Sequence, residues 1–335
     1  MEQFKLNDFT YKLTDNNRIV VEHPYKLPTS LYKFYSSSDF SIDAFTKQYI
    51  YATAPIEFND ILDSHWLLFD FSNITPNEYH KFYAKYGDNF SPKGYEQDKE
   101  NGFETIKQHW YLVYSSKVGL VSMTSSLANP LMWAHYTQET GFAVEYDTKL
   151  LMNCMLKNNK EITECHYAPI QYVSKLKPID FFSGKFKTPT IPMTYITNVK
   201  LNNWDYEKEW RLSIRKNDMG ITTGKAARNP IKKGNLEKRK YYYSQECIKA
   251  VYLSAYFFGN TYFRKSKTDT LIARKRYVPF LNHIIEHHNQ HLFSCGADYT
   301  AQNEVKRCYQ QIRLLRKGIN MFLIYYISDI HYFEE

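Results

Sequence analysis

Two glutamates stand one residue apart in the stretch NNWDYEKEWRLSI, which runs from Asn202 to Ile214. Its alternation of residue types predicts a strand, in which Glu207, Glu209 and Arg211 share one face. Like charges on one strand face repel each other unless they are solvated, paired or functional. One interpretation is a solvent-facing edge on which Arg211 neutralises part of the pair. The other is a carboxylate pair that stabilises positive charge on a reacting group.

Two earlier segments carry side chains that suit the second interpretation. LYKFYS, from Leu31 to Ser36, has strand composition and offers the cation Lys33. LVSMTSS, from Leu120 to Ser126, is also predicted to be a strand, and its Ser122 and Thr124 share a face. This order of a cation, a hydroxyl-bearing strand and an E-x-E strand resembles the order found in the ADP-ribosyltransferase superfamily.

Six blocks in a row resemble a widespread bacterial family of unknown function, and they cover most of residues 30–255. They are LYKFYS, FNDILD, LVSMTSS, LMWAHYTQETGFAVEYD, WDYEKEWR and IKAVYLS. The chain departs from the expected patterns in three places. Lys33 stands where histidine or arginine is common, and a lysine does not make the bidentate phosphate contact of an arginine. Thr124 takes the place of a serine, with Ser122 one strand period earlier, and FNDILD lacks a proline.

The superfamily resemblance implies an NAD-dependent mono-ADP-ribosyltransferase and assigns catalytic roles to the glutamates. Glu209 would contact the ribose 2′-hydroxyl and stabilise an oxocarbenium-like transition state, and Glu207 would orient or deprotonate the acceptor. Ser122 or Thr124 would hold the ribose and the catalytic carboxylate. Lys33 would contact the phosphates or ribose of NAD, which is the expected co-substrate.

Several other residues are candidates for binding NAD. In the string MWAHY, Trp133, His135 and Tyr136 can line a pocket and stack on nicotinamide or adenine, whereas Met132 is expected to pack on the sheet. For His135 a satisfied core position is an equal alternative. The remaining candidates are Tyr32, Arg211, and Asn59 with its neighbour Asp60, for which turn capping is the alternative.

The composition narrows the class of protein. Among 335 residues, 43% are hydrophobic and 17% aromatic, so a sizeable core is expected. The five cysteines are scattered without a CxxC pair, which predicts neither a disulfide framework nor a zinc ribbon. The string HIIEHHNQH places His283, His287 and His291 at a spacing of four, but no HExxH motif is present and no metal is predicted. A polar N-terminus and the absence of a long apolar run predict a cytoplasmic protein without a membrane span.

The net charge of +8 is unevenly distributed. The segments Gly224 to Lys240 and Arg264 to Tyr277 are rich in lysine and arginine and have aromatic neighbours. Such segments neutralise phosphates and stack bases, although a solvated basic face is the simpler interpretation. We therefore expect a nucleic-acid acceptor, with RNA favoured over DNA. A non-enzymatic nucleic-acid-binding module, an NAD glycohydrolase and a protein-directed ADP-ribosyltransferase are the alternatives.

The pattern of short strands with helices between them predicts an α+β fold. The resemblance specifies an ADP-ribosyltransferase-like split mixed β-sheet core with inserted helices. We expect this catalytic domain over residues 1–267 and a helical C-terminal extension over residues 268–335 that packs on it. The resemblance also suggests a bacterial toxin or phage-defence effector, which would need an antitoxin or chaperone. The extension is the expected place for such a partner to bind.

Overall fold

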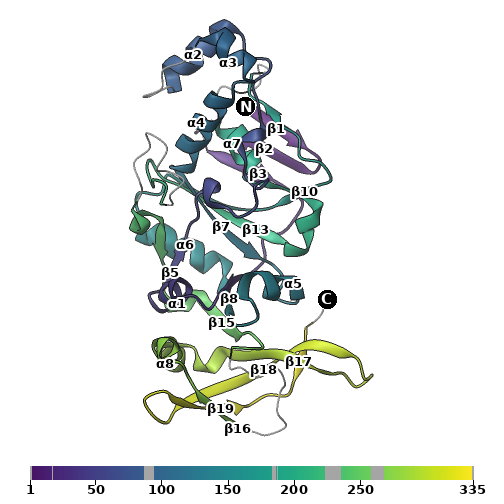
Figure 1. The fold of residues 1–335 in the computed structure, drawn as a ribbon, viewed down its shortest axis with the longest axis vertical. Helices are drawn as coiled ribbons and strands as arrows, with labels where there is room; N and C mark the ends of the chain where they lie inside the picture. The colour runs from purple at the N-terminus through teal and green to yellow at the C-terminus, as the bar shows by residue number, and fades with distance from the viewer. Residues whose placement is uncertain are drawn as a thin grey trace.

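One large mixed sheet organises the chain (Figure 1). The computed structural model describes residues 2–16, 18–86, 94–182, 186, 188–222, 235–257 and 268–333. In spatial order the strands are β16 (Thr268–Ile272), β19 (Met321–Tyr326), β18 (Val305–Arg316), β17 (Leu292–Tyr299), β15 (Ile248–Leu253), β8 (Phe142–Asp147), β4 (Ser30–Tyr35), β7 (Val118–Thr124), β13 (Glu209–Arg215) and β9 (Glu164–Pro169), and β20 (His331–Tyr332) pairs with β18. The fold is therefore α+β, as predicted, whereas the finer ADP-ribosyltransferase-like assignment stays a prediction.

Smaller strand pairs and a meander surround the large sheet. The pairs are β5 (Tyr49–Tyr51) with β14 (Lys240–Tyr242), β6 (Phe69–Asp70) with β11 (Ile179–Asp180), and β10 (Gln171–Val173) with β12 (Val199–Leu201). The meander consists of β1 (Glu2–Leu6), β2 (Phe9–Leu13) and β3 (Ile19–Glu22). The helices are α1 (Asp39–Thr46), α2 (Pro76–Tyr86), α3 (Tyr95–Glu100), α4 (Glu104–Ser115), α5 (Pro130–Met132), α6 (Thr148–Asn158), α7 (Thr190–Ile196) and α8 (Val278–His287).

The central strands are apolar because both of their faces are covered. In β7 every residue except Ser122 is buried, and in β13 only Ser213 and Arg215 are not. One apolar cluster joins the sheet to α1, α6 and α8, and a second joins it to α4, α7 and the meander. Strands buried on both faces read as near-continuous hydrophobic runs, so the few polar residues in them need specific partners.

The helical periodicity predicted beyond residue 268 is wrong for most of that segment. Within residues 268–333 the only α-helix is α8, while β16 to β20 are strands that continue the large sheet through a parallel pairing of β17 with β15. In β18 the buried residues Cys308 and Ile312 lie four apart, which also suits a helix, but the buried Leu314 reveals the strand period of two. Whether residues 268–335 form a domain separate from residues 1–267 stays a prediction.

A fully buried arginine ties the β5–β14 pair to the large sheet. Arg239 lies in the basic segment Gly224 to Lys240, of which residues 224–234 are outside the described part of the chain. Its guanidinium donates to the carbonyls of Ser115 (2.7 Å), Val118 (3.1 Å) and Ala52 (3.1 Å), and also to that of Gly220. Burial lowers its pKa. The carbonyl cage is what makes an unpaired buried cation tolerable.

Replacement of Arg239 should destabilise the fold because it leaves several buried carbonyls without donors. We expect Arg239→Met to lower the free energy of unfolding by about 3 kcal/mol or more, and Arg239→Lys to restore only part of this, because a lysine lacks the planar fork. Urea denaturation measures the loss. The neighbouring exposed Lys238 gives the control Lys238→Gln, expected within about 0.5 kcal/mol of the wild type. An Arg239→Met variant as stable as the wild type would contradict this account of the cage.

Candidate functional site

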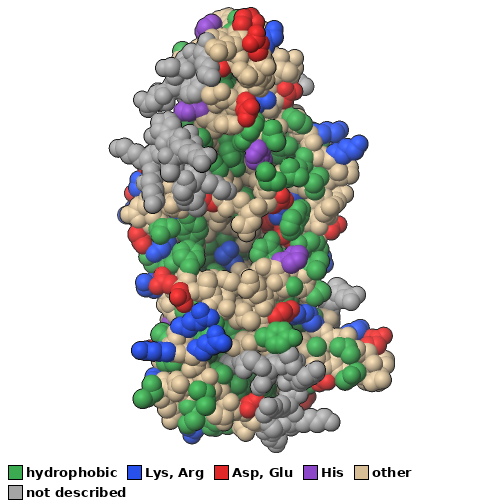
Figure 2. Space-filling model, in the orientation of Figure 1, with side chains coloured by type: hydrophobic (Ala, Val, Ile, Leu, Met, Phe, Trp, Pro, Cys, Tyr) green, Lys and Arg blue, Asp and Glu red, His purple; other side chains and the backbone are tan. Residues whose placement is uncertain are grey.

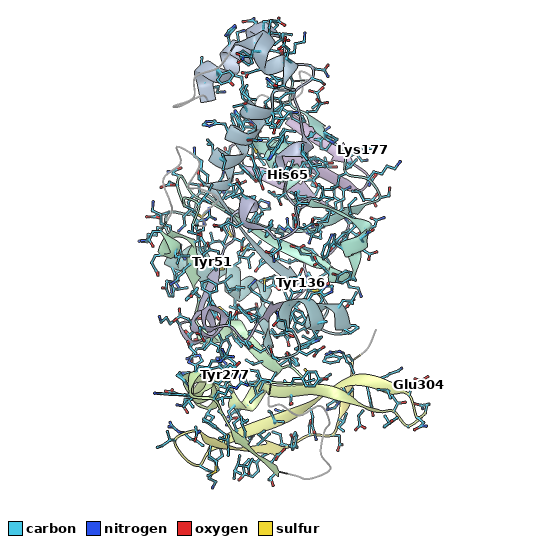
Figure 3. The ribbon with its side chains drawn as sticks, in the orientation of Figure 1. Tyr51, His65, Tyr136, Lys177, Tyr277 and Glu304 are labelled. Carbon is cyan, nitrogen blue, oxygen red and sulfur yellow. The ribbon has the colours of Figure 1, made fainter. Side chains whose placement is uncertain are left out.

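A cavity of about 360 Å³ opens where β4, β7 and β13 lie side by side. The register places Thr124 opposite Glu209 on one side and opposite Tyr32 on the other. Figure 2 shows a hollow in this face of the molecule, between the positions at which Figure 3 labels Tyr51 and Tyr136. The lining residues are Tyr32, Lys33, Phe34, Thr53, Phe58, Asn59, Asp60, Asp63, Ser122, Met123, Thr124, Met132, His135, Tyr136, Lys200, Trp204, Glu207 and Glu209.

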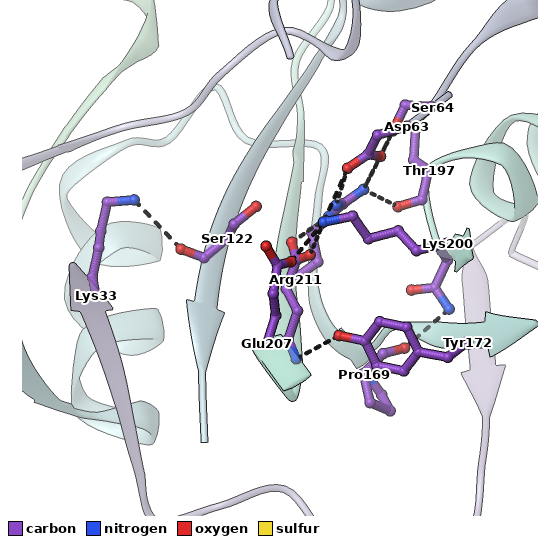
Figure 4. Close-up of polar contacts among 12 residues, drawn as sticks. Lys33, Asp63, Ser64, Ser122, Pro169, Tyr172, Thr197, Lys200, Glu207 and Arg211 are labelled. Carbon is purple, nitrogen blue, oxygen red and sulfur yellow. Dashed lines mark hydrogen bonds and ion pairs between the residues drawn. The ribbon is translucent and has the colours of Figure 1, made fainter. Parts of the chain in front are cut away.

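The ammonium of Lys200 holds three carboxylates at one wall of this cavity (Figure 4). Its Nζ lies 2.6 Å from Glu207 Oε2, 3.0 Å from Glu209 Oε2 and 3.4 Å from Asp63 Oδ2. All four side chains are buried. Lys200 and Asp63 are not among the site residues predicted from the sequence. The only signal for Lys200 is a lysine set between Val199 and Leu201 in a short apolar strand, because a solvated lysine does not need apolar neighbours on both sides.

Arg211 supplies the second positive charge of the cluster, from behind Glu209. Its Nε donates to Glu209 Oε1 at 2.9 Å, and its terminal nitrogens donate to Asp63 at 2.9 and 3.0 Å and to the carbonyl of Thr197 at 2.8 Å. The guanidinium also lies 4.8 Å from the centre of the Phe58 ring. Arg211 does not line the cavity, so the expectation that it binds NAD directly is corrected: these buried partners already use its donors.

The cluster fixes the charge of its members. Three carboxylates and two cations leave a net charge of −1 when all are ionised. Burial would raise the pKa of Glu209, but the charges of Arg211 and Lys200 outweigh it and lower that pKa below its ordinary value. Burial likewise opposes the charge of Lys200, yet Glu209 and Asp63 raise its pKa. Lys200 is therefore an ammonium that positions carboxylates, and it is not available as a nucleophile.

Glu207 belongs to a different element from the one predicted. It ends the 3-10 helix η4 (Asn202–Glu207), and β13 begins only at Glu209. Lys208 between them has φ of 42°, so the chain reverses there and the predicted strand alternation fails at Glu207. Both carboxylates nevertheless reach Lys200. Burial raises the pKa of Glu207, and its Oε1 accepts a hydrogen bond from the hydroxyl of Tyr136.

Lys33 occupies the opposite side of the cavity (Figure 4). Its Nζ donates to the carbonyl of Ser122 at 3.4 Å and lies 5.6 Å from the Tyr35 ring centre. Within the described ranges no carboxylate forms a salt bridge with it. Burial lowers the pKa of Lys33 to about 8, although Glu209 opposes this effect. A half-buried ammonium of this kind, without a paired carboxylate, favours an anionic ligand.

The hydroxyls of Ser122 and Thr124, both predicted to hold the ribose and the catalytic carboxylate, have different contacts. The Ser122 side chain is among the groups that keep the pKa of Glu209 low. The hydroxyl of Thr124 instead accepts from the backbone N–H of Ser126 at 3.0 Å and lies 3.3 Å from the Ser126 carbonyl. Thr124 thus stabilises the turn after β7, whereas Ser122 is the hydroxyl placed for the carboxylate.

The MWAHY segment presents its faces differently from the prediction. Trp133 opens the π-helix η3 (Trp133–Thr137), is fully buried, and donates its indole N–H to the Leu127 carbonyl at 2.8 Å. Its ring packs against Phe34, so Trp133 does not stack in the cavity, which corrects that expectation. Met132, predicted to pack on the sheet, lines the cavity together with His135 and Tyr136. His135 and Tyr136 lie three and four positions after Met132, so these three side chains share one face of the helical turn. Trp133 faces the sheet instead.

The remaining residues predicted to bind NAD also lie at the cavity. Tyr32, Asn59 and Asp60 line the cavity. Asp60 Oδ1 also accepts from the backbone N–H of Leu62 at 2.9 Å, which is the turn-capping alternative for that residue. In the described part of the chain, no group of three or more histidine, cysteine, aspartate or glutamate side chains is arranged to hold a metal ion, and no helix has the length and apolar character needed to cross a membrane.

One family model matches part of the chain. The family model DUF2971, described as a protein of unknown function, matches residues 132–212. That segment begins at Met132 and contains Lys200, Glu207, Glu209 and Arg211, so it carries most of the ion cluster. Nothing among curated proteins or solved structures matches the chain. The match agrees with the resemblance to an uncharacterised family, and the link to ADP-ribosyltransferases remains a proposal.

Removal of the Lys200 ammonium should produce a stability loss that depends on pH. We expect Lys200→Met to lower the free energy of unfolding by about 3 kcal/mol at pH 7.5, since it leaves buried carboxylates without compensation. Without Lys200 the folded-state pKa of Glu207 rises further above its ordinary value, so stability falls as pH rises through that range. The deficit relative to the wild type should therefore shrink at pH 5.5, as measured by urea denaturation at both pH values.

Lys175→Met removes an exposed lysine and is the matched control, with no expected change at either pH. An equal deficit for Lys200→Met at pH 7.5 and pH 5.5 would show that the loss comes from packing and not from the carboxylates.

Proposed function

We propose that the protein is an NAD-dependent mono-ADP-ribosyltransferase. The observation that carries the proposal is the convergence of Lys33 on β4, Ser122 on β7 and Glu209 on β13 at one cavity, from three adjacent strands. The chain order of these residue types also predicts a common site. A cation, a hydroxyl and an ionised carboxylate are the groups needed to bind a dinucleotide and labilise its glycosidic bond.

The reaction breaks the bond between C1′ of the ribose and the nicotinamide nitrogen, and the electron pair leaves with nicotinamide. Positive charge then develops on the ribose, and an ionised Glu209 at its 2′-hydroxyl stabilises that charge. Arg211 and Lys200 keep the carboxylate ionised and fixed, while the cluster as a whole retains a net charge of −1. A preorganised charge of this kind acts strongly because the surrounding side chains exclude water.

Glu207 serves as the base for the incoming acceptor. An oxygen or nitrogen of the acceptor attacks C1′ and releases its proton to the Glu207 carboxylate. The raised pKa of Glu207 suits this role, because a buried carboxylate holds a proton more strongly than an exposed one. Tyr136, which donates to Glu207 and lines the cavity, positions that carboxylate and flanks the nicotinamide.

The biological role that fits this chemistry is that of a bacterial toxin or phage-defence effector. The acceptor class that we favour is nucleic acid, with RNA ahead of DNA, since the chain is basic with a net charge of +8. NAD glycohydrolysis on the same scaffold is the nearest alternative, in which water replaces the acceptor.

Labelled NAD tests the proposal directly. We expect the purified protein to transfer label from NAD to RNA, DNA or cell lysate, and Glu209→Gln to reduce the rate by about 10³-fold because the stabilising charge is gone. Asp205→Asn is the matched control, since Asp205 is exposed, lies in the same segment and does not line the cavity. Circular dichroism verifies that Glu209→Gln is folded, and Ser122→Ala, expected to lose about tenfold, provides a milder second variant.

Three results are informative in this experiment. Label that ends on a macromolecule supports transfer, and free ADP-ribose alone identifies a glycohydrolase. If a folded wild-type protein shows neither transfer nor NAD hydrolysis with any acceptor, the enzymatic proposal is wrong.

The role of Lys33 predicts how NAD affinity depends on pH. With a pKa of about 8, Lys33 is an ammonium at pH 7 and is largely neutral at pH 9.5, so its attraction for the NAD phosphates is lost as pH rises. We expect the Kd for NAD, measured by calorimetry, to increase severalfold between these pH values. A Lys33→Gln variant should bind weakly at both. A wild-type Kd that does not change across this range would remove Lys33 from the phosphate site.

A further inference from the structure

One further hollow adjoins the cavity, and another lies at the C-terminal strand β16. The first, of about 240 Å³, shares Lys33, Phe34, Thr53 and Tyr136 with the cavity and is also lined by Ser36. The second, of about 310 Å³, is lined by the next residue along the chain, Ser37. We call this second one the C-terminal hollow. Because Ser36 and Ser37 are consecutive, these two hollows lie against the same short segment of chain between β4 and α1.

The C-terminal hollow has aromatic walls and hydroxyls at its inner side. Tyr256, Phe257 and Tyr277 line it, and the rings of Phe257 and Tyr277 lie 5.6 Å apart. The hydroxyls of Ser37 and Thr140, which also line it, lie 3.1 Å from each other. Exposed aromatic rings beside hydrogen-bonding groups are the usual components of a site for a planar base.

Three consecutive cations stand at the rim of this hollow. Arg274, Lys275 and Arg276 are all exposed, and both arginines line it. Arg276 lies over the Tyr277 ring at 4.7 Å and donates to the Tyr277 hydroxyl at 2.7 Å. Across the described ranges none of the three forms a salt bridge. Lysine and arginine side chains gather on this face where Figure 1 places α8, and Figure 3 labels Tyr277 there.

We propose that the C-terminal hollow binds single-stranded nucleic acid. One unstacked base lies against Tyr256 and Tyr277, and the phosphates on either side pair with Arg274, Lys275 and Arg276. A hollow of about 310 Å³ admits a single base but not a stacked duplex step, which favours a single strand. That the hollow serves as the acceptor site of the transferase rests on the proposed function. In that role the bound nucleic acid would run past Ser36 and Ser37 and place a downstream nucleotide near Glu207.

Binding of a fluorescein-labelled twelve-nucleotide single-stranded RNA to the full chain, without NAD, tests the inference by fluorescence anisotropy. We expect Arg274→Gln, Lys275→Gln and Arg276→Gln together to weaken binding at least tenfold. The slope of log Kd against log salt should fall by about 2, since each lost phosphate contact removes about 0.7. Ile272→Glu should also weaken binding, because Ile272 is 72% exposed at the rim and its replacement there repels phosphate without disturbing the core.

The matched control removes three exposed lysines at the other end of the molecule: Lys5→Gln, Lys81→Gln and Lys99→Gln together. We expect it to change the Kd less than threefold. If this control weakens binding as much as the rim variant does, or if a poly-glutamate peptide displaces RNA as well as unlabelled RNA does, the surface responds only to charge and the inference is wrong. The same conclusion follows if the rim variant binds RNA like the wild type.

This experiment separates the inference from the proposed function. RNA binding that depends on the rim, in a protein without any NAD chemistry, would refute the transferase proposal and leave the binding site in place. NAD hydrolysis that continues in a rim variant with unchanged RNA binding would refute only the binding site.

Discussion

The ion cluster around Lys200 is the interaction on which the cavity depends. One ammonium contacts three carboxylates from two parts of the chain: Asp63 after β5, and the close pair Glu207 at the end of η4 and Glu209 at the start of β13. Buried charges are tolerated only when they are paired, so these segments are held in one relative arrangement. Such a cluster contributes less to net stability than to specificity of geometry. Here it fixes two carboxylates beside a hollow of ligand size, while Lys33, across the cavity, forms no salt bridge in the described part of the chain and donates only to a backbone carbonyl.

The C-terminal strands brace the same site from outside the segment that matches the family model. Arg307 on β18 pairs with Glu139 and lies 5.6 Å from the Trp133 ring centre. Trp133 and Glu139 bracket the turn that carries His135 and Tyr136 to the cavity. The buried indole therefore serves as the fixed point of this turn, which explains why a residue that resembles a stacking platform in the sequence is covered in the fold.

The arrangement of the site could be predicted where local patterns decide it. Strand alternation and chain order placed Lys33, Ser122 and Glu209 on strands that prove to be neighbours. Lys200 could not be found this way, because a single lysine carries no pattern and its contact with Asp63, far away in the chain, exists only in the folded structure. Spacing in β18 suited a helix as well as a strand, and only the long antiparallel pairing with β17 resolves it. At Lys208 a left-handed backbone angle interrupts a strand that composition alone would continue.

The central claim is that Glu209 meets the nicotinamide-bearing ribose inside this cavity. A crystal structure of the protein with NAD tests it most directly. The account predicts the ribose 2′-hydroxyl within hydrogen-bond distance of Glu209 and the phosphates beside Lys33. NAD bound elsewhere on the protein, or an empty cavity at millimolar NAD with Glu209 still enclosed by Lys200 and Arg211, would contradict it.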